Sequence, residues 1–166
     1  MDIKRVTFGN TLWQKAILPS LSHAAGIWFS DTLTSRKNLM SFQYKCAKAV
    51  LKLRCMPARS AILADLGWLP IMDHLDTVRA TFFDHLHKME DSRLTKIVFK
   101  ELAQIPADNH VPFNYFKNIK NIFQDRGMDH MFLSKDMINI QVFKHAVNAS
   151  YLQSFRQDNI LKHKYN

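Results

Sequence analysis

The spacing of the apolar residues is the feature that most constrains how this chain can fold. Between residues 71 and 89, large apolar side chains recur at steps of three and four: Leu75, Val78, Phe82, Leu86 and Met89. Such steps place side chains on one face of an α-helix, which turns about once every 3.6 residues. Four glycines and five prolines in 166 residues leave little turn chemistry for a many-stranded sheet. The chain is therefore predicted to be all-α.

The same periodicity predicts helices along the rest of the chain. They cover residues 12–28, with a kink or break at Pro19, and then 35–53, 60–66, 71–89, 93–102, 115–123 and 138–155. Ser60 is expected to cap the short third helix, Gly67 to end it, and Gly127 to stop the helix over 115–123.

A break in the pattern between Ala103 and Pro112 suggests how the chain is divided. This stretch contains two prolines together with Asp108 and Asn109, a composition typical of a linker. We therefore predict a bundle of about four helices over residues 1–102, a linker over 103–112, and a smaller helical region over 113–166.

The charges are distributed unevenly along the chain. From Thr32 to Ala64 there is no acidic residue, and there are seven basic ones: Arg36, Lys37, Lys45, Lys48, Lys52, Arg54 and Arg59. On a helical wheel with Lys37 at zero, the four lysines fall within roughly 80° of one another. Apolar residues fall between roughly 120° and 220°: Leu39, Phe42, Cys46, Ala49, Val50 and Leu53. This helix is thus predicted to carry a lysine stripe opposite a packing face.

A cationic face without carboxylates repels itself, so its presence suggests an anionic partner. A phosphate backbone would neutralise the lysines and release bound counterions. The net charge of +9 and the pI near 9.7 agree with a polyanionic partner. The alternative is a solvated face that keeps the protein soluble. A membrane surface is disfavoured because the apolar face is needed for the core. We expect contacts to the nucleic-acid backbone without base readout.

The titratable residues predict no catalytic or metal site. His85 and His87 would lie roughly 200° apart on a helix and could not hold one ion from a single face. Asp73 and Asp76 share a helix face, but their place in the first turns, where they complement the helix dipole, accounts for them. We therefore predict no catalytic residue, no metal, no cofactor and no small-molecule substrate.

The tryptophans and cysteines are predicted to be structural. Trp13, Trp28 and Trp68 lie among apolar residues, so core packing is favoured over stacking on bases. Cys46 lies on the predicted packing face and is expected to be a small core residue. Cys55 has no catalytic signature around it.

The sequence shows no targeting or membrane-spanning pattern. The first ten residues lack an apolar segment typical of a secretory signal. The most apolar stretch, residues 16–29, is shorter than the ~20 residues that span a bilayer. We expect an intracellular, soluble protein, in either the nucleus or the cytoplasm.

Three segments occur in a characteristic order. The first is Leu12-Trp13-Gln14-Lys15-Ala16-Ile17-Leu18-Pro19-Ser20-Leu21, followed by Gly26-Ile27-Trp28. The second is Leu39-x-x-Phe42-Gln43-x-x-x-Ala47-x-x-x-Leu51, and the third is Ala61-Ile62-Leu63-Ala64-Asp65-Leu66-Gly67-Trp68-Leu69-Pro70-Ile71. Together they resemble the thumb of reverse transcriptases from non-LTR (LINE-type) retrotransposons. Residues 10–102 carry the match, and residues 113–166 resemble the region downstream of the thumb in some animal elements.

The resemblance implies a grip on nucleic acid without a polymerase centre. In the family, the thumb holds the primer–template duplex, and aspartates of the palm hold two metal ions. The palm's Phe/Tyr-x-Asp-Asp turn is absent from this sequence. The chain therefore resembles a C-terminal piece, either a truncated reading frame or a fragment of a longer product, whose missing palm and fingers would be partners. It is not expected to polymerise DNA on its own.

The lysine stripe and the basic residues near it are the expected contact residues. The RNA or DNA backbone would be held by Lys37, Lys45, Lys48 and Lys52, with Arg36, Arg54 and Arg59 as outer contacts. A thumb without its palm is expected to expose an apolar patch, from the helix over residues 12–29, and to oligomerise or aggregate. Two alternatives remain open: a stand-alone helical module that binds protein, and an unselected relic.

Overall fold

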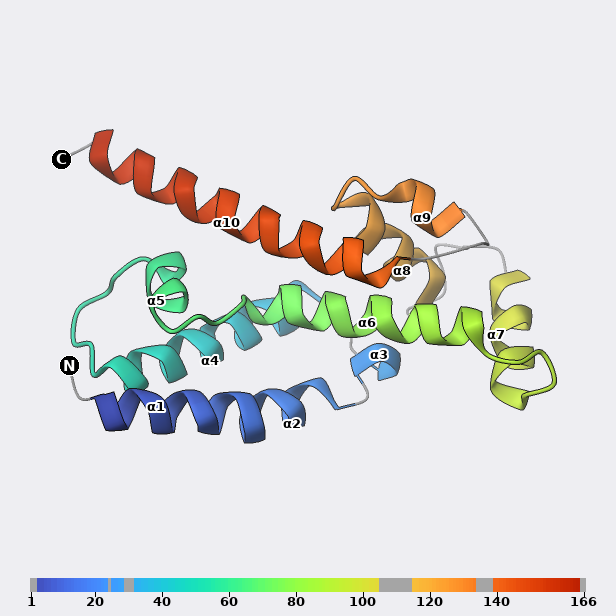
Figure 1. Ribbon diagram of the computed structural model, residues 1–166, viewed down its shortest axis with the longest axis horizontal. Coiled ribbons are helices and arrows are strands. Elements are labelled where there is room, and N and C mark those ends of the chain that lie inside the picture. The colour runs from blue at the N-terminus through green and yellow to red at the C-terminus, as the bar shows by residue number, and fades with distance from the viewer. Residues whose placement is uncertain (1–2, 24, 29–31, 105–114, 134–138, 165–166) are drawn as a thin grey trace.

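The computed structural model describes residues 3–23, 25–28, 32–104, 115–133 and 139–164, and within these ranges every element is a helix (Figure 1). The all-α prediction is confirmed. The elements are α1 (Ile3–Leu12), the π-helical turn η1 (Trp13–Ile17), α2 (Leu18–Ser22), α3 (Ala25–Trp28), α4 (Leu33–Leu51), α5 (Arg59–Asp65), α6 (Ile71–Lys88), α7 (Leu94–Gln104), α8 (Tyr115–Gln124), α9 (Asp129–Leu133) and α10 (Ile140–Lys164). In the described ranges no helix is both long and apolar enough to cross a membrane.

The irregularity expected at Pro19 is present as a change of helix type. The N–H of Leu18 donates to the carbonyl of Trp13, five residues back, at the end of η1. Proline has no N–H for the usual bond to the residue four positions earlier, and the preceding turn widens into a π-helix. The helical segment also begins earlier than predicted, at Ile3.

Gly9 explains why α1 lies so close to α4. A Cβ atom at Gly9 would be 2.5 Å from Cγ2 of Val50, closer than two carbon atoms can approach. Glycine therefore allows the two helices to meet backbone to side chain, and the guanidinium of Arg5 donates to the carbonyl of Ala49.

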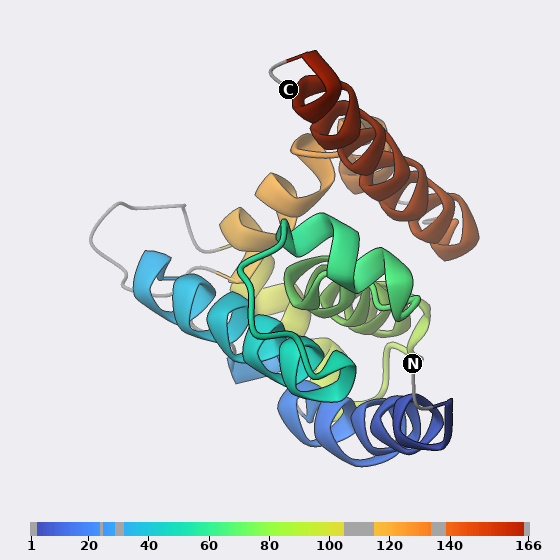
Figure 2. The same cartoon turned by 90° about the vertical axis from the view of Figure 1, so that its left-hand side faces the viewer.

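The central helix is α6, which takes part in two hydrophobic clusters. Its first turns pack in the first cluster, with Trp13, Ala25, Ala47, Leu63, Leu66 and Trp68. Its last turns pack in the second cluster, with Phe99, Ile119, Ile122, Phe123, Met128, Met131, Phe143 and Val147. Figure 2 shows the other helices arranged around α6. The division between the clusters thus falls within α6, and residues 105–114 lie outside the described residues. The proposed domain division stays a prediction.

The two clusters are filled by different aromatic arrangements. In the first, the rings of Trp13 and Trp68 stack with centroids 4.4 Å apart, and the indole N–H of Trp68 donates to Asn10. In the second, the ring of Phe83 contacts a group of aromatic rings: His87, Phe99, Tyr115, Phe116, Phe123 and Phe132. The core role predicted for Trp13 and Trp68 is confirmed, and the side chain of Trp28 lies outside the described residues.

Two helix ends occur where the sequence predicted them, and one helix start differs from its prediction. Gly67 and Gly127 have φ of 65° and 67°, and each follows a helix that it terminates, as predicted. The prediction that Ser60 caps α5 is wrong. Ala58 occupies that position without a side-chain hydrogen bond, because the chain already turns into the helix at Arg59.

Candidate nucleic-acid interface

Helix α4 carries the predicted lysine stripe, and both of its ends are fixed locally. At its start, the hydroxyl of Thr32 accepts from the backbone N–H of Ser35. At its end, Lys52 adopts a left-handed conformation with φ of 57°. This geometry lets the N–H groups of Lys52 and Leu53 donate back to the carbonyls of Ala49 and Lys48.

Gln43 determines which side of α4 faces inward. Its side chain is 2% exposed. Its amide nitrogen donates to the carbonyl of Leu69 at 2.7 Å, and its amide oxygen accepts from the N–H of Ile71 at 2.9 Å. Leu69 lies in the connection that leads into α6, and Ile71 is the first residue of α6. The amide thus satisfies two backbone groups that would otherwise be buried without partners.

The inward side of α4 is rotated from the predicted packing face. Gln43 and Ala47 are buried, at roughly 240° and 280° on the wheel that places Lys37 at zero. Phe42 and Ala49, predicted to pack, are exposed, with Phe42 at 41%. Leu39, Cys46 and Val50 of the predicted face are half-buried against the first cluster, and the buried Gln43 adds two hydrogen bonds to the neighbouring chain. The centre of the lysine stripe is then roughly 140° from the centre of the buried side.

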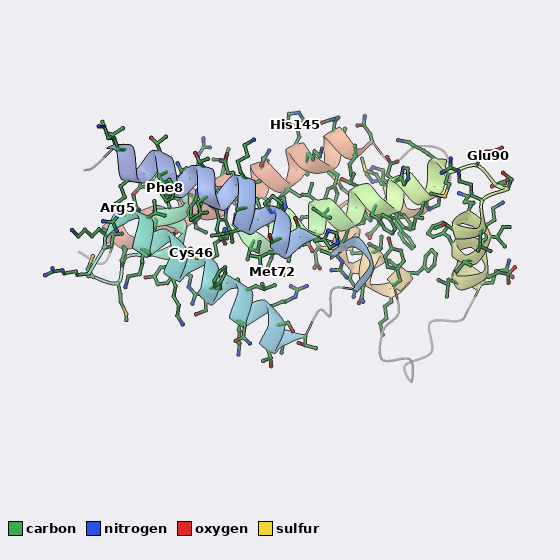
Figure 3. The ribbon with its side chains drawn as sticks, turned by 90° about the horizontal axis from the view of Figure 1, so that it is seen from below. Arg5, Phe8, Cys46, Met72, Glu90 and His145 are labelled. Carbon is green, nitrogen blue, oxygen red and sulfur yellow. The ribbon has the colours of Figure 1, made fainter. Side chains whose placement is uncertain are left out.

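The four lysines of α4, here named the lysine ridge, are Lys37, Lys45, Lys48 and Lys52. Three of them are exposed and Lys48 is half-buried. Figure 3 shows the outer side of α4 facing away from the other helices. Within the described ranges, the carboxylates form ion pairs with Arg79, Lys88, Lys100 and Arg126, and none lies within ion-pair distance of the ridge. The ridge is therefore a row of like charges that the described carboxylates do not neutralise.

An aromatic ring joins the ridge to the start of α5. The ammonium of Lys48 lies 5.7 Å from the ring centre of Tyr44, and the guanidinium of Arg59 lies 5.4 Å from it. The hydroxyl of Tyr44 donates to the carbonyl of Pro57 at 2.8 Å. Arg59 is thus held beside the ridge, and the exposed Arg54 lies in the connection between α4 and α5.

Arg36 lies on a different side of α4 from the ridge. It falls at roughly 260° on the wheel, among the inward residues, and it is half-buried. Its positive charge favours the charged form of Asp76 on α6. Helix α4 thus carries four of the seven predicted contact residues on one side, Tyr44 holds Arg59 near Lys48, and Arg36 is directed toward a buried charge cluster.

That buried cluster is the arrangement that sequence reasoning missed. Arg126, which follows α8, contacts Asp73, lies 3.8 Å from Asp76, and donates to the hydroxyl of Ser150 on α10. Asp76 also lies 3.8 Å from Arg79. The aspartates therefore do more than complement the dipole of α6, because they join α6 to the chain after α8.

Asp76 is 9% exposed. Burial raises the pKa of this carboxyl to about 6, although Arg79, Arg126 and Arg36 each favour its charged form. Its proton affinity is thus set by the balance between lost hydration and three cations. The signal available in the sequence was the pair of aspartates itself, but their partner Arg126 is distant along the chain.

Burial shifts the pKa of two further titratable side chains, His87 and Cys46. Among the described side chains, no three histidines, cysteines or carboxylates lie close enough together to hold a metal ion. The ring of His87 packs edge-on against Phe83 and Phe99, and its burial lowers the pKa of the imidazole. Cys46 is half-buried, and burial raises the pKa of its thiol.

No family model, curated protein or solved structure matches this chain. The geometry of α4 and its neighbours is therefore what bears on function.

Proposed function

We propose that this chain holds the sugar–phosphate backbone of a nucleic acid along the lysine ridge, without reading its sequence. By the resemblance of its three segments, it is a thumb fragment of a non-LTR retrotransposon reverse transcriptase. It has no polymerase activity of its own, and its other partners are the missing palm and fingers.

One observation carries the proposal: four lysines lie on one side of α4, and no described carboxylate pairs with them. Lysine side chains placed along a helix can each neutralise a phosphate, and the release of counterions favours binding. Arg59, held beside the ring of Tyr44, adds a further cation next to the ridge, and the exposed Arg54 lies in the connection after α4. These contacts address phosphates, which have no sequence information.

The test is a fluorescence-anisotropy titration with a labelled duplex oligonucleotide at low salt. The variant Lys45→Glu plus Lys48→Glu reverses the centre of the ridge and is expected to weaken binding by at least about tenfold. The control, Arg93→Glu plus Lys120→Glu, makes the same change of charge at exposed positions just before α7 and on α8. An equal loss of duplex affinity in the two variants would show that binding depends on net charge alone and would contradict the proposed role of the ridge.

A primer-extension assay with Mg²⁺ and deoxynucleotides tests the negative part of the proposal. The chain alone is expected to give no templated product. Extension by this protein would require a reactive centre elsewhere in the chain.

A protein-binding module is the second candidate, supported by exposed apolar side chains. Phe8 and Leu12, one turn apart on α1, are 68% and 44% exposed. On α7, Leu94, Ile97, Val98 and Leu102 are also exposed. If the ridge is only a solvated face, the double reversal leaves duplex affinity unchanged, while substitution of Phe8 by Glu abolishes self-association or partner binding.

A further inference from the structure

A groove lies between α6 and α10. Its volume is about 700 Å³, within the range of about 300–1,000 Å³ that is typical of small-molecule sites. The end-on view shows α4 and α10 on different sides of α6 (Figure 2). The groove is thus separate from the lysine ridge and is not explained by the nucleic-acid grip.

The apolar lining of the groove comes from both helices. Val78 and Phe82 belong to α6, and the fully buried Val147 belongs to α10. Phe82 is held in place from behind, because a Cβ atom at Gly26 of α3 would be only 2.9 Å from its Cγ. A fixed aromatic side chain beside aliphatic groups favours a flat, weakly hydrated ring.

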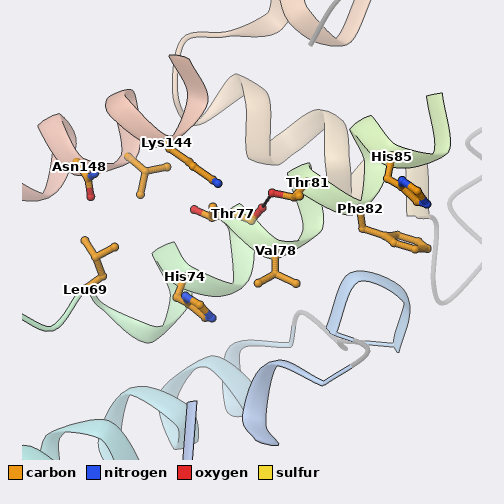
Figure 4. Close-up of a pocket in the computed structure, with 10 residues that line it drawn as sticks. Leu69, His74, Thr77, Val78, Thr81, Phe82, His85, Lys144 and Asn148 are labelled. Carbon is orange, nitrogen blue, oxygen red and sulfur yellow. Dashed lines mark hydrogen bonds between the residues drawn. The ribbon is translucent and has the colours of Figure 1, made fainter. Parts of the chain in front are cut away.

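The polar groups of the groove favour an anion. Lys144 and Asn148 project from α10, and Figure 4 shows the ammonium of Lys144 directed into the groove. His74 and His85 project from α6, and no carboxylate is among the described lining residues. A negative group placed here would meet the lysine and the amide without a competing acid.

The hydroxyl groups of the two threonines in the groove already donate hydrogen bonds to backbone carbonyls of α6. The hydroxyl of Thr77 donates to the carbonyl of Asp73 at 2.8 Å, and that of Thr81 donates to the carbonyl of Thr77 at 2.7 Å. Their oxygens can still accept hydrogen bonds, for example from a sugar hydroxyl or a ring amino group. The groove thus offers an apolar wall, acceptors at its centre and a cation at one side.

We propose that this groove binds a small ligand that combines a planar ring with a phosphate, of the nucleoside monophosphate class. The ring lies against Val78, Phe82 and Val147, and the phosphate meets Lys144 and Asn148. This site goes beyond the nucleic-acid grip, and it departs from the sequence-based expectation that the chain has no small-molecule ligand.

The experiment is an NMR titration of the intact chain with AMP, following the imidazole C–H signals of His74 and His85. AMP is expected to shift both signals saturably, with a Kd of about 1 mM or below. Adenosine and inorganic phosphate, each lacking one half of the ligand, are expected to bind at least about tenfold more weakly. No saturable shift with AMP, or equal affinity for AMP and either half, overturns the proposal.

Two variants localise the binding. Lys144→Met is expected to weaken AMP binding about tenfold and to remove the preference for AMP over adenosine. Thr81→Phe, at an exposed position on α6, fills the groove and is expected to abolish the shifts. The control Lys120→Met changes an exposed lysine of α8 and should leave the affinity for AMP as it is. An equal loss in Lys120→Met contradicts the assignment.

The two proposals fail independently. Lys45→Glu plus Lys48→Glu should weaken duplex binding by at least about tenfold and leave the AMP shifts unchanged. If AMP shifts are lost in that variant as well, the ligand is bound through general charge and the groove is not its site.

Discussion

The chain before α6 and the chain from α6 onward differ in how their basic residues are balanced and paired with carboxylates. Residues 1–70 contain ten lysines and arginines but three aspartates, whereas residues 71–166 contain thirteen basic and eleven acidic residues. In the second region, Asp84 binds Lys88 at 2.7 Å, Asp91 binds Lys100 at 2.8 Å, and Asp73 binds Arg126. In the first, the lysine ridge has no such carboxylate among the described residues.

The difference separates charges that stabilise the fold from charges available to a partner. Lys96, for example, is buried, and its ammonium donates to the carbonyls of Leu86 and His87 at the end of α6. A cation at that position satisfies carbonyls that have no partner within the helix. The ridge lysines instead repel one another on the outside of α4, and this repulsion opposes folding. Phosphates that bind to the ridge would neutralise these charges.

The largest expected effect comes from removing the hydrogen bonds of Gln43, which hold α4 to the chain at the start of α6. Gln43→Leu removes both hydrogen bonds that hold α4 to the start of α6 and leaves the N–H of Ile71 without its partner. We expect the free energy of unfolding to fall by about 2–4 kcal/mol. Urea denaturation followed by circular dichroism measures it. Asn38→Ala, at an exposed position of α4, is the control and should change little.

A second substitution tests whether a cation in the other region is structural. Lys96→Met leaves the end of α6 without its donor, and we expect a loss of about 1–3 kcal/mol in the free energy of unfolding. Lys100→Met removes only an exposed pair with Asp91 and should leave the denaturation midpoint nearly unchanged. Similar effects of the two variants would contradict the distinction between buried and exposed cations.

The pH dependence of stability tests the buried cluster that joins the two regions. Because burial raises the pKa of Asp76 to about 6, the folded state takes up a proton more readily than the unfolded chain. Its stabilising contribution is therefore present at low pH and is lost as the pH rises from about 4 through about 6.

Between pH 7 and pH 5 this carboxyl should add about 1 kcal/mol to the stability. His74 and His87 act in the opposite direction, because burial lowers the pKa of both imidazoles. The measurement is thus the difference between the parent protein and Asp76→Asn, followed by urea denaturation across this range. Parallel pH profiles for the two proteins would contradict the assignment.

The smallest expected effect on stability is that of a single substitution in the ridge, and it separates the role of a lysine in folding from its role in binding. Lys45→Glu replaces a repulsion with Lys48, three residues later, by an attraction, and should stabilise the fold by about 0.3 kcal/mol. The same change should weaken duplex binding. Thermal denaturation and anisotropy on one preparation measure the two together, and a variant that loses both stability and affinity would show that Lys45 serves the fold.

The helices could be predicted because their signals are local. Apolar steps of three and four gave α6 its start at Ile71, and Gly67 and Gly127 marked two helix ends. Helix α9 was not predicted, since five residues are too short for a period to show. The polar contacts that fix α4 and α6 join residues distant in sequence, such as Gln43 with Leu69 and Asp73 with Arg126. No local pattern indicates which glutamine or arginine will be buried.

Only the part of the candidate interface that depends on local spacing could be predicted. The lysine spacing alone placed four side chains on one face of α4. The direction of Arg36 and the contact of Tyr44 with Arg59 depend on how α4, α5 and α6 meet. The groove between α6 and α10 depends on the packing of two helices that are separated by residues 89–139 in the sequence.

The salt dependence of duplex binding tests the ridge most directly. If four ridge lysines each neutralise a phosphate, log Kobs should fall against log salt with a slope of about −4 for the parent protein. For Lys45→Ala plus Lys48→Ala the slope should be about −2, since two contacts are removed. A slope that is the same in both proteins would contradict the account.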